Sequence, residues 1–323
     1  MALPAVHEAP SIEKWSRFDI LVAGEINPDL ILTGEDLIPR FGQHELLIDG
    51  ATLAIGSSSA IFACGAARLG LRVAFVGIVG DDLFGHYMLD AMHICGVDVS
   101  PVIVDKNVQT GLSVILNRGT DRAILTFPGC ISKLTAQHVS TDLLSRSRHL
   151  HVASYFLQTA LQPDLPDLFR HAHSLGVTTS LDTNWDPQKE WAGFDKLLQL
   201  VDVFLPNENE ALAISQAEDL SGSLDWLAAR SPLVVVKLGA RGAVARTKER
   251  SAFAPALPVQ VVDTVGAGDS FDAGFLYGYL NGWPLERSLR LACVCGSLST
   301  RAAGGTGGQP TLDEAIMAMD ALG

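Results

Sequence analysis

The alternation of short apolar runs with helical segments is the feature that most constrains the fold of this 323-residue chain. The runs are rich in Val, Ile, Leu and Phe, which is typical of strands buried on both faces of a sheet. We expect strands at 18–23, 72–79, 149–153, 177–182, 201–205 and 233–238. Segments with helical apolar spacing lie between them, at 60–69, 83–94, 165–175 and 224–229. This order predicts an α/β fold, with a mostly parallel sheet and helices on both faces.

Two regions interrupt the alternation. Residues from about 28 to 54 show no convincing helix pattern, and residues 110–128 contain two strand-like runs, 110–116 and 122–127. We expect both regions to form a small β-sheet that projects from a single domain spanning 1–323. Such a sheet can serve as a lid that excludes water, as a surface for dimerisation, or as both. We therefore expect a homodimer formed through the lid.

The charge balance and the cysteines limit the partners and the compartment. With 23 Lys and Arg against 36 Asp and Glu, the net charge is −13, which argues against a surface for nucleic acid or anionic membrane. Neither the first residues nor the uncharged stretch 51–67 has the apolar run of a signal peptide or a membrane span. An odd number of dispersed cysteines is typical of reduced, buried thiols in a cytoplasmic protein. They are Cys64, Cys95, Cys130, Cys293 and Cys295.

Several common catalytic motifs are absent from the sequence. No glycine is followed by lysine, which excludes a Walker-type phosphate loop, and no G-x-G-x-x-G follows a strand. The missing glycine fingerprint argues against an NAD-dependent oxidoreductase. The sequence also lacks H-E-x-x-H and G-x-S-x-G. We expect the histidine pairs at 149 and 151 and at 171 and 173 to be structural.

The segment 263–275 is the strongest candidate for a site, because it passes from a glycine-bearing loop into a helix that should begin near Gly268 or Asp269. The first N–H groups of a helix have no partner within the helix, and Gly266, Ala267 and Gly268 are small enough for a phosphate to approach the backbone. Asp269 either caps this helix or accepts a proton from a bound hydroxyl group.

At these residues the chain resembles the ribokinase-like (PfkB) carbohydrate kinase family. The family motif D-T-x-G-A-G-D-x-F is matched from Asp263 to Phe271 without a gap. The resemblance implies a three-layer α/β sandwich with a small β-sheet lid, and it implies ATP and Mg²⁺ as cofactors. It assigns Asp269 as the catalytic base, and it assigns the amides of residues 266–268 to an anion hole for the transferred γ-phosphoryl group.

The first strand and the loop after it, 24–29, resemble the sugar-contacting loop of the family. The resemblance places Asn27 and Asp29 on substrate hydroxyls. An amide that donates and accepts, next to a carboxylate that only accepts, suits a polyol. Taken alone, the two residues are equally consistent with an Asx turn.

Residues 56–85 resemble the N-terminal motif of the family, and the resemblance implies substrate contacts at Gly56, Ser57 and Ser58. Two residues depart from the pattern. Ser57 stands where many members have glycine, and Ile61 stands where many have an asparagine that contacts the sugar. These departures leave the identity of the sugar open.

Two further elements resemble the nucleotide-binding parts of the family. Asn207 and Glu210 match an N-x-x-E element that arranges water around Mg²⁺, and they also fit an ordinary helix start. Lys237, Gly239 and Gly242 match the nucleotide loop, in which the glycines let the backbone approach ATP and the lysine reaches a phosphate. Taken alone, this G-x-x-G segment is a common hairpin turn.

A monovalent cation, K⁺ or Na⁺, orders the anion hole in some members of the family. The positions that correspond to its ligands are Asp263 and the backbone carbonyls of Val265, Ala303 and Gly305.

The sequence therefore predicts an ATP-dependent kinase that phosphorylates a hydroxymethyl group of a small sugar or sugar derivative. One alternative is a nucleoside kinase of the same family, with Phe41, Tyr155 and Phe156 as stacking faces. The other alternative is a catalytically silent sensor of a sugar or nucleotide.

Overall fold

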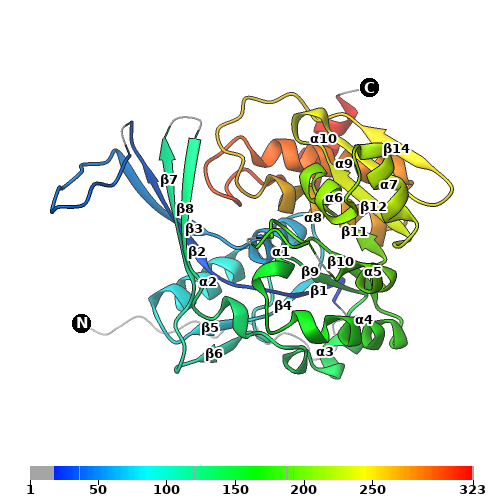
Figure 1. Cartoon of the computed structure of the whole chain (residues 1–323), viewed down its shortest axis with the longest axis horizontal. Helices are drawn as coiled ribbons and strands as arrows, with labels where there is room; N and C mark the ends of the chain where they lie inside the picture. Colours follow the sequence, from blue (N-terminus) through cyan, green and yellow to red (C-terminus); the bar gives the residue numbers. More distant parts are fainter. Residues whose placement is uncertain (1–17, 36, 119–120, 187, 192, 322–323) are drawn as a thin grey trace.

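The computed structural model describes residues 18–35, 37–118, 121–186, 188–191 and 193–321, so the expected absence of a signal peptide concerns residues that are not described. An eight-stranded sheet with the order β14-β13-β12-β11-β10-β9-β1-β4 lies at its centre (Figure 1). Six neighbouring strands are parallel, and β13 and β14 are added in antiparallel fashion. The strands are β1 (Ile20–Ala23), β4 (Val73–Val76), β9 (His149–Val152), β10 (Thr178–Leu181), β11 (Val203–Phe204), β12 (Leu233–Lys237), β13 (Ala243–Arg246) and β14 (Ser251–Ala254).

Helices cover both faces of this sheet, which confirms the predicted α/β fold. One face packs against α1 (Ser58–Arg68), α2 (Leu83–Ile94), α8 (Ala267–Leu280), α9 (Leu285–Ser299) and α10 (Leu312–Asp320). The other face packs against α3 (Thr141–Ser145), α4 (Leu165–Ser174), α5 (Phe194–Leu197), α6 (Glu208–Ser215) and α7 (Leu220–Ala228). Short 3₁₀ helices lie at Ile131–Lys133, Ala136–His138, Tyr155–Leu157, Gln162–Asp164, Leu198–Leu200 and Gly239–Arg241.

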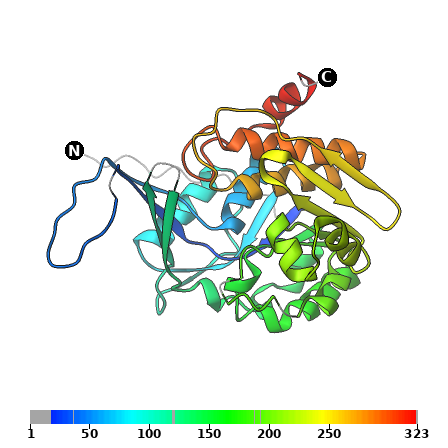
Figure 2. The same cartoon turned by 45° about the horizontal axis from the view of Figure 1, so that its top comes forward.

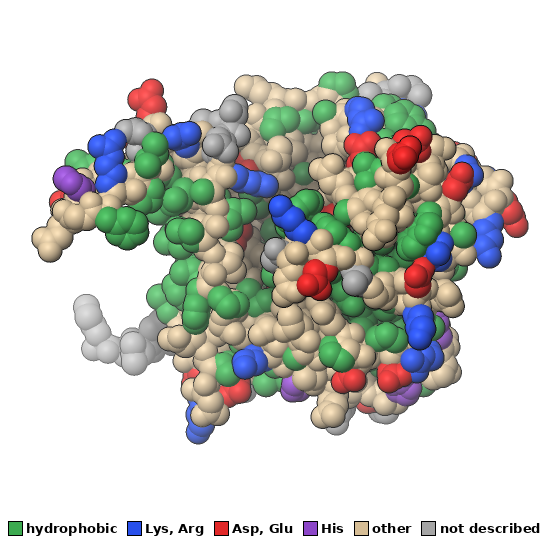
Figure 3. Space-filling view, viewed as in Figure 1, with side chains coloured by type: hydrophobic (Ala, Val, Ile, Leu, Met, Phe, Trp, Pro, Cys, Tyr) green, Lys and Arg blue, Asp and Glu red, His purple; other side chains and the backbone are tan. Residues whose placement is uncertain are grey.

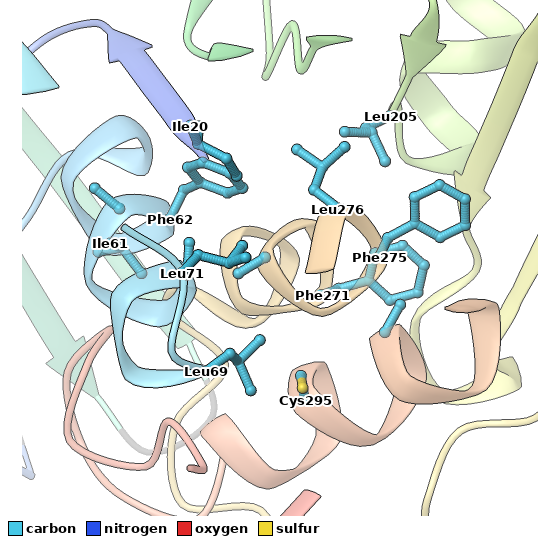
Figure 4. Packing of buried hydrophobic residues seen from close by; sticks show 14 of the residues in the cluster. Ile20, Ile61, Phe62, Leu69, Leu71, Leu205, Phe271, Phe275, Leu276 and Cys295 are labelled. Carbon is cyan, nitrogen blue, oxygen red and sulfur yellow. The ribbon is translucent and has the colours of Figure 1, made fainter. Parts of the chain in front are cut away.

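The apolar runs are continuous because the side chains of successive residues pack in the cores on opposite faces of the sheet. In β12, Val235 packs in the core beneath α8 and α9, while Val234 and Val236 pack in the core on the opposite face. Side chains of α1, α8 and α9 fill the first of these cores, among them Phe62, Leu276 and Cys295 (Figure 4). Cys95, the C-cap of α2, is only partly buried, so the prediction of buried thiols is wrong for Cys95.

The strand predicted at 72–79 is divided into β4 and β5 (Ile78–Gly80), which pairs with β6 (Ile103–Asp105) in a separate two-stranded sheet. The division falls at Gly77. A Cβ atom at this position would lie 2.7 Å from the carbonyl oxygen of Gly24, so the backbone there passes too close to β1 for a larger residue.

A second, four-stranded sheet projects from the body of the molecule (Figures 1 and 2). We call it the lid sheet; its order is β3 (Gly50–Ile55), β2 (Pro28–Thr33), β7 (Leu112–Arg118) and β8 (Asp121–Phe127). Its strands come from the two regions that interrupted the alternation. The connection between β2 and β3 extends away from the rest of the molecule (Figure 1). Tyr87 of α2 holds the sheet to the body, because its hydroxyl donates a hydrogen bond to the carbonyl of Leu53, at 3.0 Å.

Across the described ranges, no helix combines the length and the apolar character that crossing a membrane requires.

Candidate active site

A cavity of about 470 Å³ opens between the carboxyl end of β12 and the start of α8. Five residues that the sequence assigned to nucleotide or phosphate binding line it together: Lys237, Gly239, Gly242, Ala267 and Gly268. The space-filling view also shows the molecule hollowed between the lid sheet and the part that carries α8 (Figure 3).

The sequence reasoning missed the rest of the cavity wall. The segment after β14 supplies Ala256, Leu257, Pro258, Val259 and Val261, and α9 with its end supplies Cys293, Gly296, Ser297 and Thr300. The backbone N–H of Leu257 donates to the hydroxyl of Ser297, at 3.1 Å, which ties the segment to α9. The apolar character of residues 256–261 outside a strand was the only signal for this wall.

The helix α8 begins at Ala267, within two residues of the prediction. Gly266 is its N-cap, with a φ of 71°, and no side chain caps the first turn. A Cβ atom on Gly266 would lie 2.7 Å from the Cα atom of Gly305, so this position requires glycine for its conformation and for its space. The backbone N–H of Ala267 donates a long hydrogen bond to the carbonyl of Thr264, at 3.3 Å, and the amides that follow it in the first turn of α8 are left for a ligand.

Asp269 lies in the first turn of α8, behind the cavity rather than in its lining, and is 8% exposed. Burial, with the nearby Asp182 carboxylate, raises the pKa of Asp269 well above its ordinary value. The Ser58 hydroxyl opposes this rise of the pKa of Asp269, so Ser58 lies near the acid. Its oxygen accepts a hydrogen bond from the side-chain amide of Asn184.

A buried charge cluster lies beside Asp269. The ammonium of Lys237 is 2.7 Å from an oxygen of Asp182 and 3.0 Å from an oxygen of Asp272. Burial lowers the pKa of Lys237, but the carboxylates of Asp182 and Asp272 outweigh it and raise that pKa. Lys237 thus reaches the cavity near Gly268 with its charge already paired.

The sequence reasoning singled out neither Asp182 nor Asp272. Two signals were available. Asp182 directly follows the buried strand β10, and Asp272 stands three residues after Asp269, on the same side of α8.

Asn207 and Glu210 form a capping box at the start of α6. The side-chain amide of Asn207 donates to one oxygen of Glu210 at 2.6 Å, and its backbone N–H donates to the other at 2.9 Å. Burial, together with the Asp182 carboxylate, raises the pKa of Glu210 to about 7. Both interpretations of this element, a helix start and a site near phosphates, are compatible with this geometry.

Asn27 and Asp29 lie where the lid sheet joins the body. Asn27 Nδ2 is 3.5 Å from the hydroxyl of Ser113 on β7. Burial raises the pKa of Asp29 to about 7, and the Asp263 carboxylate adds to this. A Cβ atom on Gly56 would lie 2.2 Å from an Asp29 oxygen, so Gly56 lets this carboxylate approach the backbone.

Ser57 has a structural role in addition to the predicted one. Its hydroxyl donates to the carbonyl of Glu25 at 2.6 Å and accepts from the N–H of Ala60 at 3.1 Å, which caps α1. These bonds fix the start of α1, where Ser58 also lies.

Of the positions predicted to hold a monovalent cation, Asp263 joins the loop before α8 to the loop at Gly304. One of its oxygens accepts from the N–H of Val265 at 3.0 Å, and the other accepts from the N–H of Gly304 at 2.9 Å. Gly305 packs against Gly266 and against the buried side chain of Ile61. Ile61 therefore packs against the loop that leads into α8, at Gly266, and against Gly305. The Ala303 carbonyl oxygen lies towards Gly307, at 3.1 Å from a Cβ atom placed on that residue.

Of the proposed stacking residues, Tyr155 and Phe156 contact each other, with ring centroids at 5.2 Å, but Phe41 is exposed on another segment. Tyr155 and Phe156 pack on Phe194, with ring centroids at 5.4 and 5.7 Å, and Phe41 is fully exposed on the connection between β2 and β3. His149 and His151 are buried and each bind Ser180 at 2.7 Å, as expected for structural histidines.

A central helix that begins at a small-residue anion site, with a buried acid in its first turn and a cavity beside it, is the arrangement of a phosphotransferase that acts on a hydroxyl acceptor. Residues 18–312 match the pfkB family carbohydrate kinase model, and the chain belongs to this family.

Two curated relatives agree with this assignment, and a solved structure has the same fold. The chain is 30% identical over 279 residues to a 5-dehydro-2-deoxygluconokinase of Geobacillus thermodenitrificans, covering 80% of this chain and 82% of the relative. It is 31% identical over 289 residues to a 2-dehydro-3-deoxygluconokinase of Bacillus subtilis, covering 84% and 88%. A putative ribokinase II from E. coli, solved in complex with ATP and Mg²⁺, superimposes with a TM-score of 0.81 at 23% identity, covering 94% of this chain and 99% of that one.

Proposed function

We propose that this kinase transfers the γ-phosphoryl group of ATP to a hydroxymethyl group of a small sugar or sugar derivative, with Asp269 as the base. The observation that carries the proposal is the start of α8, where the uncapped first turn borders the cavity and Asp269 lies one residue further on. The amides of residues 266–268 would bind the phosphoryl group as negative charge develops on it. Asp269 would accept the proton of the acceptor hydroxyl.

Among the described residues, no group of three or more His, Cys, Asp and Glu side chains could hold a metal ion directly, so Mg²⁺ would bind through water and the nucleotide phosphates. Asp182, Glu210 and Asp272 bring three buried carboxyl groups to one lysine, Lys237, so a cation that binds here would offset their excess negative charge. Mg²⁺ prefers oxygen ligands and keeps several of its waters, so Asn207 and Glu210 would hold it through water. When bound, it would neutralise charge on the phosphates.

The proposal includes K⁺ or Na⁺ as a second cation. Asp263 supports it, because this carboxylate joins the loop before α8 to the loop at Gly304. A hard cation with oxygen ligands from Val265, Ala303 and Gly305 would stiffen the same junction.

The cavity beside α8 would take the nucleotide, and Asn27, Asp29 and Gly56 at the base of the lid sheet would take the acceptor. The names of the two relatives suggest deoxyketo sugar acids as the first acceptors to test. A nucleoside acceptor has less support, because Tyr155 and Phe156 are packed against Phe194.

The lid sheet would close over the acceptor and pair two subunits. It exposes large apolar side chains that a second copy could cover, on the connection between β2 and β3 and on β8. They are Phe41, Leu46, Leu47, Ile124, Leu125 and Phe127. The proposed kinase would act in the cytoplasm.

Acceptor identity can be tested by combining thermal shift with ADP production. A panel of deoxyketo sugar acids, hexoses, pentoses and nucleosides is presented with MgATP. A true acceptor at 100 times its Kd should stabilise the fold by about 2.7 kcal/mol and should also support ADP production. Turnover with nucleosides alone would establish a nucleoside kinase, and ATP binding without acceptor-dependent turnover would establish a silent sensor.

Substitution Ser58→Ala should move the acid limb of the pH profile of kcat to higher pH. The hydrogen bond from Ser58 lowers the pKa of Asp269, so its loss leaves burial less opposed and raises that pKa further. The base must be ionised, so activity should disappear at a higher pH as the solution is acidified. Ser297→Ala, which removes a cavity hydroxyl that accepts from the backbone N–H of Leu257, is the control. An unchanged acid limb in Ser58→Ala would show that Ser58 does not influence the pKa of the catalytic base.

A further inference from the structure

The buried carboxylate of Glu25 lies at the centre of a hydrogen-bond network that joins several segments around the proposed acceptor site. Glu25 follows β1 and Gly24 and is 3% exposed. One of its oxygens accepts from the hydroxyl of Ser154 at 2.8 Å and from the backbone N–H of Ser59 at 3.2 Å. The other oxygen accepts from the hydroxyl of Ser59 at 2.5 Å. Groups from two other segments, the start of α1 and the loop after β9, thus bind this acid.

The residue before the acid, Gly24, makes room for this contact. A Cβ atom on Gly24 would lie 2.1 Å from the hydroxyl oxygen of Ser59, so the absence of a side chain lets that hydroxyl reach the Glu25 carboxylate. Ser57 is a third serine at the same acid. Its hydroxyl lies 3.0 Å from the carboxylate and donates to the backbone carbonyl of Glu25 at 2.6 Å. The start of α1 is therefore held to the loop after β1 at two serines.

The network continues to the loop after β10 through Asn184. The side-chain amide of Asn184 donates to the hydroxyl of Ser154, at 2.9 Å, and to the hydroxyl of Ser58. Ser58 lies near Asp269, and α1 packs along α8. A chain of hydrogen bonds thus leads from Glu25 through Ser154 and Asn184 to the hydroxyl beside the proposed base.

Three residues of this network have a left-handed backbone conformation that residues other than glycine rarely adopt. They are Ser57, Ser154 and Asn184, with φ values of 68°, 51° and 52°. Such conformations are strained, and they persist only where the surrounding contacts hold them. The side chains of all three residues make hydrogen bonds within the network. These bonds reach Glu25 either directly or through one further residue, so the strained backbone is held in place from this carboxylate.

We propose that Glu25 is a positioning residue for the acceptor. Its carboxylate fixes the relative places of three segments: the loop that carries Asn27 and Asp29, the start of α1 with Ser58, and the loop that carries Asn184. This inference rests on the proposed function, which assigns these segments to the acceptor site. Glu25 is enclosed by protein, so it acts on the acceptor through these neighbours. Without the carboxylate, the segments would move apart, and the acceptor hydroxyl would no longer be held opposite the base.

The charge of Glu25 also acts on Asp269. Burial and the Asp182 carboxylate raise the pKa of Asp269, the Glu25 carboxylate adds to this rise, and the ammonium of Lys237 opposes it. Asp272, one turn further along α8, is another charged group next to Asp269. Replacement of Glu25 by glutamine removes one negative charge and so lowers the pKa of Asp269. The base then stays ionised at lower pH, and the acid limb of the pH profile of kcat moves in that direction.

Hydrogen exchange of the full-length protein, measured by mass spectrometry without a ligand, tests whether Glu25 holds the segments. In Glu25→Ala, peptides that cover 56–60, 153–158 and 181–186 should exchange faster than in the wild type. Peptides from the cavity wall at 256–261 should exchange at the wild-type rate. Ser154→Ala breaks only the link between Glu25 and the loop after β10, so exchange should rise at 153–158 and 181–186 but not at 56–60. Wild-type exchange of these peptides in both variants would overturn the proposal, and Ser154→Ala decides it if Glu25→Ala does not fold.

Kinetics with MgATP and the panel acceptor that gives the highest wild-type turnover test the consequence for the reaction. Glu25→Ala should lower kcat/KM for the acceptor about 10²-fold and leave KM for MgATP unchanged. Glu25→Gln should move the acid limb of kcat to lower pH, opposite to the shift expected for Ser58→Ala. Ser154→Ala keeps the charge of Glu25, so it should raise KM for the acceptor without moving the acid limb. The matched control, Glu286→Gln, removes an exposed carboxylate from the first turn of α9 and should change neither.

Two kinetic results would overturn the proposal. One is an acid limb that Glu25→Gln leaves in place. The other is an equal rise of KM for the acceptor and for MgATP in Glu25→Ala, which would indicate a general distortion of the fold. A wild type without acceptor-dependent turnover would overturn the proposed function instead, and hydrogen exchange would still decide whether Glu25 holds the three segments.

Discussion

Asp269→Asn lowers kcat by at least about 10²-fold, because asparagine keeps the size and the hydrogen bond to Ser58 but cannot accept a proton. The loss reflects chemistry rather than unfolding. The pKa of Asp269 in the folded state is raised above its unfolded value, so its ionised form at pH 8 lowers the free energy of unfolding. An uncharged side chain should therefore leave the protein at least as stable at that pH.

The measurement is kcat from acceptor-dependent ADP production, together with Tm for both proteins. The matched control is Asp313→Asn, which removes an exposed carboxylate from the first turn of another helix, α10. This control should keep full activity. Turnover of the Asp269→Asn variant close to that of the wild type would remove Asp269 from its proposed role.

Gly266→Ala should lower kcat about 10²-fold and the free energy of unfolding by about 1–3 kcal/mol. The residue has a φ of 71°, and its new Cβ would meet the backbone of Gly305 at 2.7 Å. The atoms of Gly305 that the new Cβ would meet, its Cα and its carbonyl oxygen, belong to the backbone. The loop around 303–305 and the loop that leads into α8 must therefore move apart. The amides would then no longer converge on one phosphoryl group.

The variant Gly282→Ala is the control that separates the cost of a left-handed backbone conformation from the cost of a steric clash. Gly282, just after α8, has a φ of 67°, but a Cβ there would meet nothing within 4 Å. This variant should show the stability cost of a left-handed alanine, about 1 kcal/mol, and normal kcat. The two variants could lose equal activity, or Gly266→Ala could lose none. Either result would show that catalysis does not need the packing of Gly266 on Gly305.

The sequence predicted those features that depend on local pattern. The apolar runs marked β1 and β12, since a strand buried on both faces is apolar at nearly every residue. The small residues at 266–268 marked the start of α8 to within two residues, because loop and helix patterns meet there. The irregular regions 28–54 and 110–128 contain the strands of the lid sheet.

Features that depend on contacts between distant segments were not predicted. Asp182 and Asp272 meet at Lys237 although 90 residues separate the two acids in the sequence, and no local signal pairs them. The nearness of Ser58 to Asp269, which comes from the packing of α1 on α8, was not predicted either.

A crystal structure with ADP, aluminium fluoride and an acceptor identified by the screen tests the central claim most directly. We predict that the acceptor hydroxyl lies within hydrogen-bond distance of Asp269, about 2.6–3.2 Å, and that the fluoride group of the phosphoryl mimic accepts from the first-turn amides of α8. An acceptor hydroxyl that faces another carboxylate, with Asp269 still enclosed by protein and bonded to Ser58 alone, would contradict it.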